Sequence, residues 1–287
     1  MEHDPSIASK RFFLLDMDGT IYLDETLFDG TTDLLEAVRR AGGKYLFLTN
    51  NSSRSVEAYI EKMERLGIAA QRDDFLTSVD ALLCYLSERG YRDKLLYAFG
   101  TASFRQQLAQ AGFRLTTRPE AEVAALVCGF DTELTFRKLE DACILLGRGV
   151  DFIAANPDWV CPTWYGYVPD CGSVCQMLTR ATGREPIFIG KPKPEMVCLA
   201  LDRWGFSPGE TLVVGDRLYT DIACGKNAGV DTALVLSGES TLADVRQSEV
   251  KPTHIFENIR ALCDAFVGGP EPAAGAAQNP TEERRKL

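Results

Sequence analysis

The sequence predicts an α/β protein built on a doubly wound, mainly parallel sheet. Short apolar runs alternate with amphipathic stretches along the chain, several of those stretches end at a glycine, and polar clusters directly follow the apolar runs. Strands that are buried on both faces of a parallel sheet have such continuous apolar sequences, and glycine commonly follows the last residue of a helix. At 287 residues the chain is long enough to form two packed units.

Two separate stretches of the chain supply the elements of the main sheet. The predicted strands are residues 12–15, 45–48, 187–189, 212–214 and 232–236. The predicted helices between them are residues 31–41, 55–66, 194–204, 218–228 and 242–248. This order of elements is typical of a parallel sheet that is covered by helices.

The middle of the chain repeats the same pattern. The predicted strands are residues 94–98, 124–128 and 152–154, and the predicted helices are residues 101–111 and 136–146. Residues 156–172 then show no periodicity and are too many for a simple connector, so we expect an ordered loop with a role in specificity. Packing of this loop by its own prolines and aromatic residues is the alternative. Residues 268–287 are rich in Gly, Pro, Ala and charge, and we expect a disordered tail.

Composition excludes several classes of protein. The chain has 31 basic and 41 acidic residues, for a net charge of -10, which disfavours a broad surface for nucleic acid. No stretch approaches the roughly 18 consecutive apolar residues of a membrane span, and the N-terminus lacks the pattern of a signal peptide. The nine cysteines are an odd number spread singly along the chain, which is typical of buried thiols in a reducing compartment. We therefore expect a cytoplasmic protein with no nucleic-acid or membrane partner.

The first polar cluster is the pair Asp16 and Asp18, which follows an apolar run and precedes Gly19 and Thr20. Side chains two residues apart on a strand point the same way, so the two carboxylates converge where the strand ends. A divalent cation with a preference for oxygen ligands would relieve their repulsion, and magnesium fits best. A turn with helix-capping aspartates is the alternative for this segment alone.

Three more polar clusters follow predicted strands. They are the segment that starts with Thr49 and Asn50, the segment with Lys191 between Gly190 and Pro192, and the segment with Asp216 and Asp221. In open parallel sheets, ligands bind at the carboxyl ends of the strands, so these groups should meet in one crevice. Acids for a metal and a nucleophile, combined with donors for phosphate oxygens, are what magnesium-assisted phosphoryl transfer requires.

The four clusters, in this order, resemble the motifs of the haloacid dehalogenase (HAD) superfamily of aspartate-nucleophile phosphatases. The matching segments are DMDGT, LTNNSS, GKPKPEM and VGDRLYTD. The insertion between the second and third segments is similar to the type IIA cap of the NagD-like and 4-nitrophenylphosphatase group. The resemblance extends over roughly residues 9–267. It implies a discontinuous core at residues 9–90 and 184–267, with an inserted α/β cap domain at residues 91–183.

The resemblance also implies roles for the clustered residues. Asp16 is expected to be the nucleophile that forms an aspartyl-phosphate, and Asp18 the general acid and base. The metal ligands would be the Asp16 carboxylate, the Asp18 backbone carbonyl and Asp216, with Asp221 bound directly or through water. Thr49, Asn50 and Lys191 are expected to hold the phosphate oxygens.

For the cap, the resemblance implies closure over the site and substrate specificity. The candidates for substrate contact are Asn156, Asp158, Trp159, Trp164, Tyr165 and Tyr167. Packing between cap and core, or between two copies in a homodimer formed through the cap, is an equally good interpretation of the aromatic residues.

The function implied is that of a magnesium-dependent phosphatase. Its partner would be a small-molecule phosphate ester such as a sugar phosphate or a nucleoside monophosphate, hydrolysed through an aspartyl-phosphate. A phosphomutase, or a phospho-acceptor regulatory protein using the same site, remains the alternative.

Overall fold

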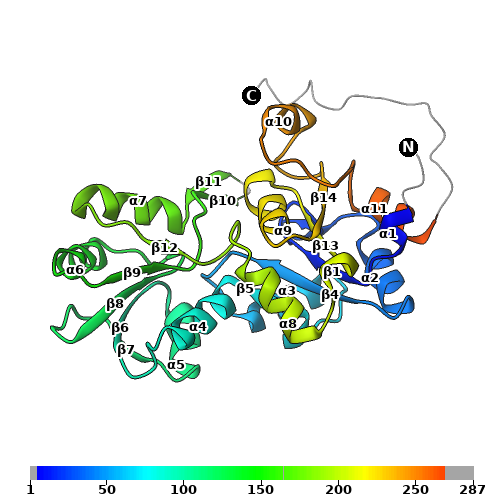
Figure 1. Cartoon of the computed structure of the whole chain (residues 1–287). Coiled ribbons are helices and arrows are strands. Elements are labelled where there is room, and N and C mark those ends of the chain that lie inside the picture. Colours follow the sequence, from blue (N-terminus) through cyan, green and yellow to red (C-terminus); the bar gives the residue numbers. More distant parts are fainter. Residues whose placement is uncertain (1–4, 164, 269–287) are drawn as a thin grey trace.

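The computed structural model describes residues 5–163 and 165–268. Within these residues the larger sheet has six strands in the order β15-β14-β13-β1-β4-β5, and every neighbouring pair is parallel. The strands are β1 (Phe12–Leu15), β4 (Lys44–Thr49), β5 (Phe75–Thr77), β13 (Thr211–Gly215), β14 (Asp231–Val235) and β15 (His254–Phe256). The predicted fold class is confirmed, with β1 at the centre of the sheet between β13 and β4 (Figure 1).

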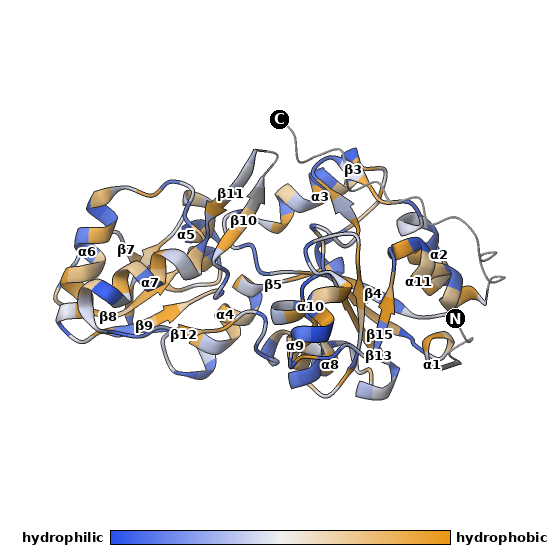
Figure 2. Ribbon diagram, turned by 90° about the horizontal axis from the view of Figure 1, so that it is seen from above, coloured by the Kyte–Doolittle hydropathy of each residue, from blue (hydrophilic) through white to orange (hydrophobic). Residues whose placement is uncertain are grey.

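Helices cover both faces of this sheet because successive side chains of each strand point to opposite faces. Phe12 and Leu14 belong to one apolar cluster, and Phe13 and Leu15 belong to the other. The first cluster includes side chains of α4 (Ser78–Glu88), α8 (Glu195–Trp204) and α9 (Ala223–Asn227); the second includes side chains of α2 (Thr31–Arg40), α3 (Val56–Arg65) and α11 (Ile259–Val267). In Figure 2, β4 is accordingly coloured as largely hydrophobic.

The middle of the chain forms a second parallel sheet, in the order β12-β9-β8-β6-β7. Its strands are β6 (Leu95–Phe99), β7 (Arg114–Thr116), β8 (Val123–Cys128), β9 (Asp151–Ala154) and β12 (Ile187–Phe188). The elements α6 (Phe136–Gly147) and α7 (Cys171–Thr182) pack against one face of this sheet, and α5 (Ala102–Gln110) packs on the other.

The strand β12 corrects the prediction for residues 187–189, which placed that strand in the main sheet. It pairs with β9 of the second sheet instead, and the ladder continues through hydrogen bonds from the N–H groups of Ile189 and Gly190. The second sheet thus extends past residue 184, where we expected the core to resume. A strand of two residues carries too little pattern to indicate which sheet it joins.

The two sheets share one apolar core through α4. Leu82 and Leu86 of this helix lie in the same cluster as Leu14 of the main sheet and as Leu96 and Val127 of the second sheet. The sequence analysis did not predict α4 or the short strand β5 that precedes it. The second sheet is therefore packed onto the main one and not merely tethered to it.

The expected loop at residues 156–172 is largely an antiparallel hairpin of β10 (Val160–Thr163) and β11 (Gly166–Pro169), followed by the first turn of α7. Its strands each contain a proline, which argues against a strand except at the edge of a sheet. Both strands of an isolated hairpin are edges, so the prolines are tolerated here.

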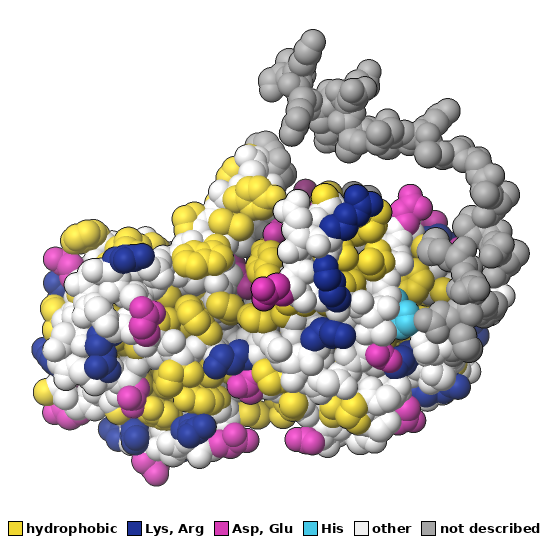
Figure 3. Space-filling view, turned by 45° about the horizontal axis from the view of Figure 1, so that its top comes forward, with side chains coloured by type: hydrophobic (Ala, Val, Ile, Leu, Met, Phe, Trp, Pro, Cys, Tyr) yellow, Lys and Arg dark blue, Asp and Glu magenta, His cyan; other side chains and the backbone are white. Residues whose placement is uncertain are grey.

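Apart from a turn that follows β13, the remaining elements are short. They are α1 (Pro5–Ala8), the hairpin of β2 (Tyr22–Leu23) and β3 (Thr26–Leu27), α10 (Leu242–Gln247), and the 3-10 turns η1 (Arg72–Asp74) and η2 (Pro208–Glu210). None of the helices in the described part of the chain is long and apolar enough to cross a membrane. Acidic and basic side chains are interspersed on the face shown in Figure 3. The predicted tail falls at residues 268–287, and all of it beyond Gly268 lies outside the described residues.

Candidate active site

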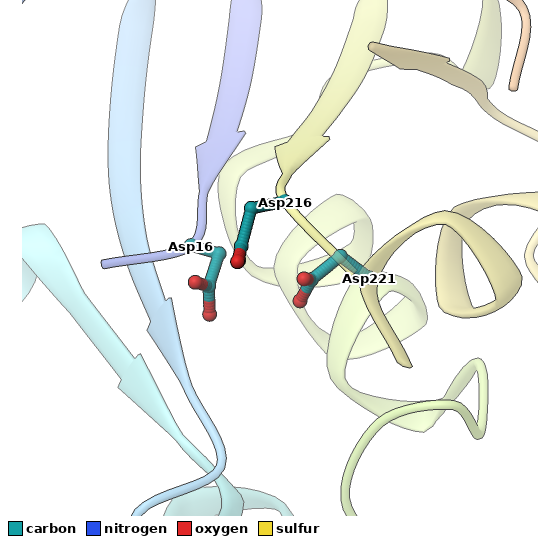
Figure 4. Close-up of side chains that lie close together, drawn as sticks. All are labelled: Asp16, Asp216 and Asp221. Carbon is teal, nitrogen blue, oxygen red and sulfur yellow. The ribbon is translucent and has the colours of Figure 1, made fainter. Parts of the chain in front are cut away.

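Three carboxylates converge at the carboxyl ends of β1 and β13. Asp16 directly follows β1, Asp216 directly follows β13, and Asp221 comes from the π-helical turn η3 (Leu218–Ile222). One oxygen of each lies within 4.8 Å of the others, and Figure 4 shows the three side chains pointing toward one another. Because β1 and β13 are parallel neighbours, with the Asp16 N–H donating to the Val214 carbonyl at 2.8 Å, their ends coincide in space.

We predicted one helix over residues 218–228. The structure instead begins this segment with the π-turn η3 and becomes α-helical only at α9. The Asp221 carboxylate accepts a hydrogen bond from the Arg217 N–H at 3.1 Å, which fixes the side chain toward the end of β13. Single π-turns are frequent at functional sites because they redirect one side chain.

Glycines make room for these acids. A β-carbon at Gly215 would lie 2.2 Å from the Asp221 β-carbon, and one at Gly238 would lie 2.0 Å from an Asp216 oxygen. Gly19 has a φ of +86°, and its β-carbon would lie 2.6 Å from the same oxygen. Only glycine allows the backbone to approach the carboxylates this closely.

Lys191 is the cation of the cluster. Its Nζ donates to Asp16 Oδ1 at 2.5 Å, to Asp221 Oδ1 at 2.6 Å and to the Leu48 carbonyl at 3.2 Å. The side chain is only 3% exposed. Burial alone would lower the pKa of Lys191, but the two carboxylates outweigh it and raise the pKa, so the ammonium keeps its charge.

The cluster fits a divalent cation. Burial and the nearby Asp221 raise the pKa of Asp16 well above its usual value, and burial raises the pKa of Asp216 to about 6. Asp216 Oδ2 accepts a hydrogen bond from the Glu239 N–H at 2.7 Å, whereas the buried Asp216 Oδ1 has no hydrogen-bond partner among the described residues. Hard oxygen donors with one orphaned carboxylate oxygen suit magnesium or a similar ion.

Asp18 lies beside this cluster, and its carboxylate is not one of the three that could share an ion. Its side chain lines the same cavity as Asp16 and Lys191. The Tyr22 hydroxyl donates to Asp18 Oδ2 at 3.4 Å, and the Lys62 Nζ lies 3.8 Å from Asp18 Oδ1. The carboxylate thus stands next to Asp16 with both oxygens facing a protein donor.

Thr49 is the last residue of β4 and Asn50 follows it; both predicted phosphate ligands line the cavity. The Asn50 side chain is already engaged: its Nδ2 donates to Asp158 Oδ1 at 3.0 Å and to the Lys191 carbonyl at 2.9 Å, and its Oδ1 accepts from the Lys191 N–H at 2.8 Å. The structure therefore gives the Asn50 amide a role in joining segments, which the sequence did not indicate.

The candidate substrate contacts of the insertion occupy different positions. Asp158 lines the cavity, whereas Asn156 is fully buried and donates to the Asn50 carbonyl at 2.6 Å. Tyr165 is exposed and does not line the cavity. The same holds for Trp159 and Tyr167. Trp164 lies outside the described residues.

Several residues of the cavity were missed. The cavity has a volume of about 50 Å³. The lining residues that the sequence analysis did not single out are Asn51, Val160, Cys161, Asp170, Arg217 and Thr220. Arg217 stands inside the fourth polar segment and forms an ion pair with Glu239, with Nε 2.8 Å from Oε2, so its position in the segment was the available signal. Burial and the nearby Asp158 raise the pKa of Asp170 to about 7. No pattern in the sequence indicated Asp170.

Comparison with known proteins agrees with this geometry. A haloacid dehalogenase-like hydrolase family matches residues 13–114, and a HAD-hydrolase-like family matches residues 188–262. An acid sugar phosphatase of Staphylococcus aureus is 34% identical over 247 residues, which cover 86% of this chain and 94% of that protein. The chain belongs to the haloacid dehalogenase-like hydrolases.

Solved structures place the chain more narrowly. A 4-nitrophenylphosphatase from Thermotoga maritima has a TM-score of 0.86 at 36% identity and covers 91% of this chain and 99% of its own. A glycerol phosphate phosphatase from Mycobacterium tuberculosis, solved in complex with magnesium, has a TM-score of 0.85 at 31% identity. The match covers 93% of this chain and 82% of that protein's chain. Within its family, the chain is a phosphatase of the NagD-like group.

Proposed function

We propose that the protein is a magnesium-dependent phosphatase that hydrolyses a small phosphate monoester through an aspartyl-phosphate on Asp16. The observation that carries the proposal is the environment of Asp16. One oxygen of its carboxylate lies within 4.8 Å of an oxygen of Asp216 and of an oxygen of Asp221. The carboxylate also accepts a 2.5 Å hydrogen bond from Lys191. Such a site offers a nucleophile, an ion position and a cation for phosphate at one point.

In the first step an Asp16 oxygen attacks phosphorus, and the bond from phosphorus to the leaving oxygen breaks. Asp18, protonated at that stage, gives its proton to the leaving alcohol. Lys191 and Thr49 hold the non-bridging oxygens, whose charge must stay balanced during transfer. The buried setting of Asp16 strengthens these interactions because little water competes with them.

In the second step water attacks the phosphorus of the aspartyl-phosphate, and Asp18 accepts the proton of that water. The bond from phosphorus to the Asp16 oxygen breaks, which releases phosphate and restores both carboxyl groups. Asp16, Asp216 and Asp221 would hold magnesium, with the Asp18 backbone carbonyl as a further ligand. When bound, this ion supplies positive charge for the phosphate oxygens.

The substrate we propose is the phosphate ester of a small alcohol, such as a sugar phosphate, a glycerol phosphate or a nucleoside monophosphate. The cavity of about 50 Å³ has room for a phosphate group beside Asp16, Thr49 and Lys191, which line it. The names of the relatives, an acid sugar phosphatase and a glycerol phosphate phosphatase, support the same class.

The test is phosphate release with magnesium from a panel of these esters and 4-nitrophenyl phosphate. Asp16→Asn should lose at least about a thousandfold in kcat with the fold intact, because an amide cannot form the acyl-phosphate. Asp73→Asn is the matched control: Asp73 is an exposed carboxylate paired with Arg203 at 2.9 Å, and its loss should leave turnover unchanged.

Two results would contradict the proposal. Turnover of Asp16→Asn near the wild-type rate would remove Asp16 as nucleophile. Stoichiometric phosphorylation of Asp16 in the wild type, without phosphate release from any ester, would point to a phosphomutase or a phospho-acceptor protein instead.

A further inference from the structure

A buried lysine outside the four polar segments lies beside Asp18. Lys62 belongs to α3, where its buried neighbours Tyr59 and Met63 pack into the apolar core. Its side chain is only 10% exposed, and its Nζ lies 3.8 Å from Asp18 Oδ1. The same Nζ lies 3.7 Å from the centroid of the Tyr22 ring. Burial of an ammonium group is costly, so an apolar side chain at this position would stabilise the fold more than a lysine does if packing were its only role.

Tyr22 holds the other side of the same carboxylate. It is fully buried, and its hydroxyl donates to Asp18 Oδ2 at 3.4 Å. A tyrosine hydroxyl keeps its proton at neutral pH, so it is a donor to this oxygen. The Tyr22 ring also stabilises the Lys62 ammonium through a cation–π contact.

We propose that Lys62 and Tyr22 are positioning residues, which hold the Asp18 carboxylate in the orientation for proton transfer to the leaving oxygen. The Asp18 side chain is 46% exposed and lines the cavity, so without these two contacts little would restrict its rotation. This inference rests on the proposed function, in which Asp18 protonates the leaving group.

The role predicts a dependence on the leaving group. An alcohol such as glycerol is a poor leaving group and needs a proton as its bond to phosphorus breaks. The 4-nitrophenolate ion is weakly basic and leaves without one. Misplacement of Asp18 should therefore slow the hydrolysis of glycerol phosphate far more than that of 4-nitrophenyl phosphate.

The experiment measures kcat/KM for both esters in the wild type, Lys62→Met and Tyr22→Phe. This parameter reports the steps up to departure of the leaving group. Each variant should lose about tenfold or more with glycerol phosphate and less than about threefold with 4-nitrophenyl phosphate, since general acid catalysis contributes about 10²–10⁴-fold. Lys62→Arg, which keeps the charge, should recover part of the loss.

Lys44 offers a matched control. Its Nζ lies 3.8 Å from Asp74 Oδ1 and 5.5 Å from the centroid of the Trp204 ring, so it too lies between a carboxylate and an aromatic ring. It begins β4, at the end of the strand opposite to Thr49. Lys44→Met should leave kcat/KM unchanged with both esters.

Equal losses with the two esters would overturn the inference, and so would a further loss from Lys62→Met in an Asp18→Asn background, where no carboxylate remains to be positioned. If Lys62→Met does not fold, Tyr22→Phe decides the matter, because it keeps the ring and removes only the hydroxyl. A wild-type protein that hydrolyses neither ester would instead refute the proposed function, and the inference with it.

Discussion

Asp170 combines two tasks in one side chain. It caps α7, accepting a hydrogen bond from the Cys171 N–H, and it lines the active-site cavity beside Asp158. Its pKa of about 7 in the folded protein lies above the value of 3.8 expected for an exposed aspartate. The folded state therefore binds this proton more tightly than the unfolded state does. The contribution of Asp170 to stability must fall as the pH rises from about 4 to about 7.

Asp170→Asn should remove this loss of folding stability with rising pH. Asparagine caps a helix as well as aspartate does and needs no ionisation. In EDTA, we expect the variant to exceed the wild type in Tm by about 2 °C or more at pH 8 and to match it at pH 4. The measurement is thermal unfolding at both pH values, and an equal gain at both would contradict the argument.

Individual residues of the site were predictable to different degrees. Asp16, Asp216 and Lys191 each follow a strand directly, so their approach to one another follows from the topology of a parallel sheet. Lys62 and Asp170 could not be found in this way. Their neighbours come from other elements, and the sequence does not show which helix face or hairpin end meets them.

At the level of elements, the segment that follows β4 is the joint between the two sheets. The Asn50 carbonyl accepts hydrogen bonds from Ser78 Oγ at 2.7 Å and from the Asn156 side chain at 2.6 Å. Ser52 Oγ accepts from the Phe130 N–H at 2.8 Å, and the Ser53 carbonyl accepts from Thr101 Oγ1 at 2.9 Å. A turn expected to bind only phosphate thus also fixes the second sheet to the first.

Asn50→Ala tests this joint. The change leaves the peptide of Lys191 and the Asp158 carboxylate without their partner, at about 1–3 kcal/mol for each buried group that stays unsatisfied. We expect a Tm several degrees lower and a reduced kcat, because the segment that carries Lys191 loosens. Asn227→Ala, which removes an exposed hydrogen bond to the Pro192 carbonyl, is the control and should change both quantities little. A Tm equal to that of the wild type would refute the role of Asn50 in joining the two sheets.

The order of the elements along the chain was predictable, whereas the pairing of the strands was less so. Alternating apolar and amphipathic stretches indicated most strands and helices within a residue or two. The hairpin of β10 and β11 was hidden by its prolines, and β12 was assigned to the wrong sheet. The pairing of such short strands is decided by tertiary contacts and not by local sequence.

At the scale of the whole molecule, the proposed cation site would couple ion binding to folding. Asp16 and Asp216 come from strands that meet only in the folded sheet, so the unfolded chain has no comparable site. An ion that binds only the folded state stabilises it by about 2.7 kcal/mol at a hundred times its Kd. Removal of the ion should therefore lower both stability and activity.

Titration with magnesium should raise the Tm of the wild type and restore the activity that EDTA removes, whereas zinc should not restore it, because the ligands are hard oxygens. Asp216→Asn should lose most of the Tm shift, since it replaces the carboxylate whose Oδ1 has no protein partner among the described residues. The measurements are thermal unfolding and phosphate release. Activity that survives thorough chelation would contradict the metal role.

The central position of β1 also has a consequence for the order in which a ribosome makes the chain. On one side β1 pairs with β4, which follows soon after it, but on the other side it pairs with β13, which emerges only after all the strands of the second sheet. Translation therefore delivers Asp16 early and Asp216 and Asp221 late. A prematurely terminated polypeptide that stops before residue 211 would lack two of the three carboxylates of the cluster, so aborted synthesis yields a fragment without a complete site.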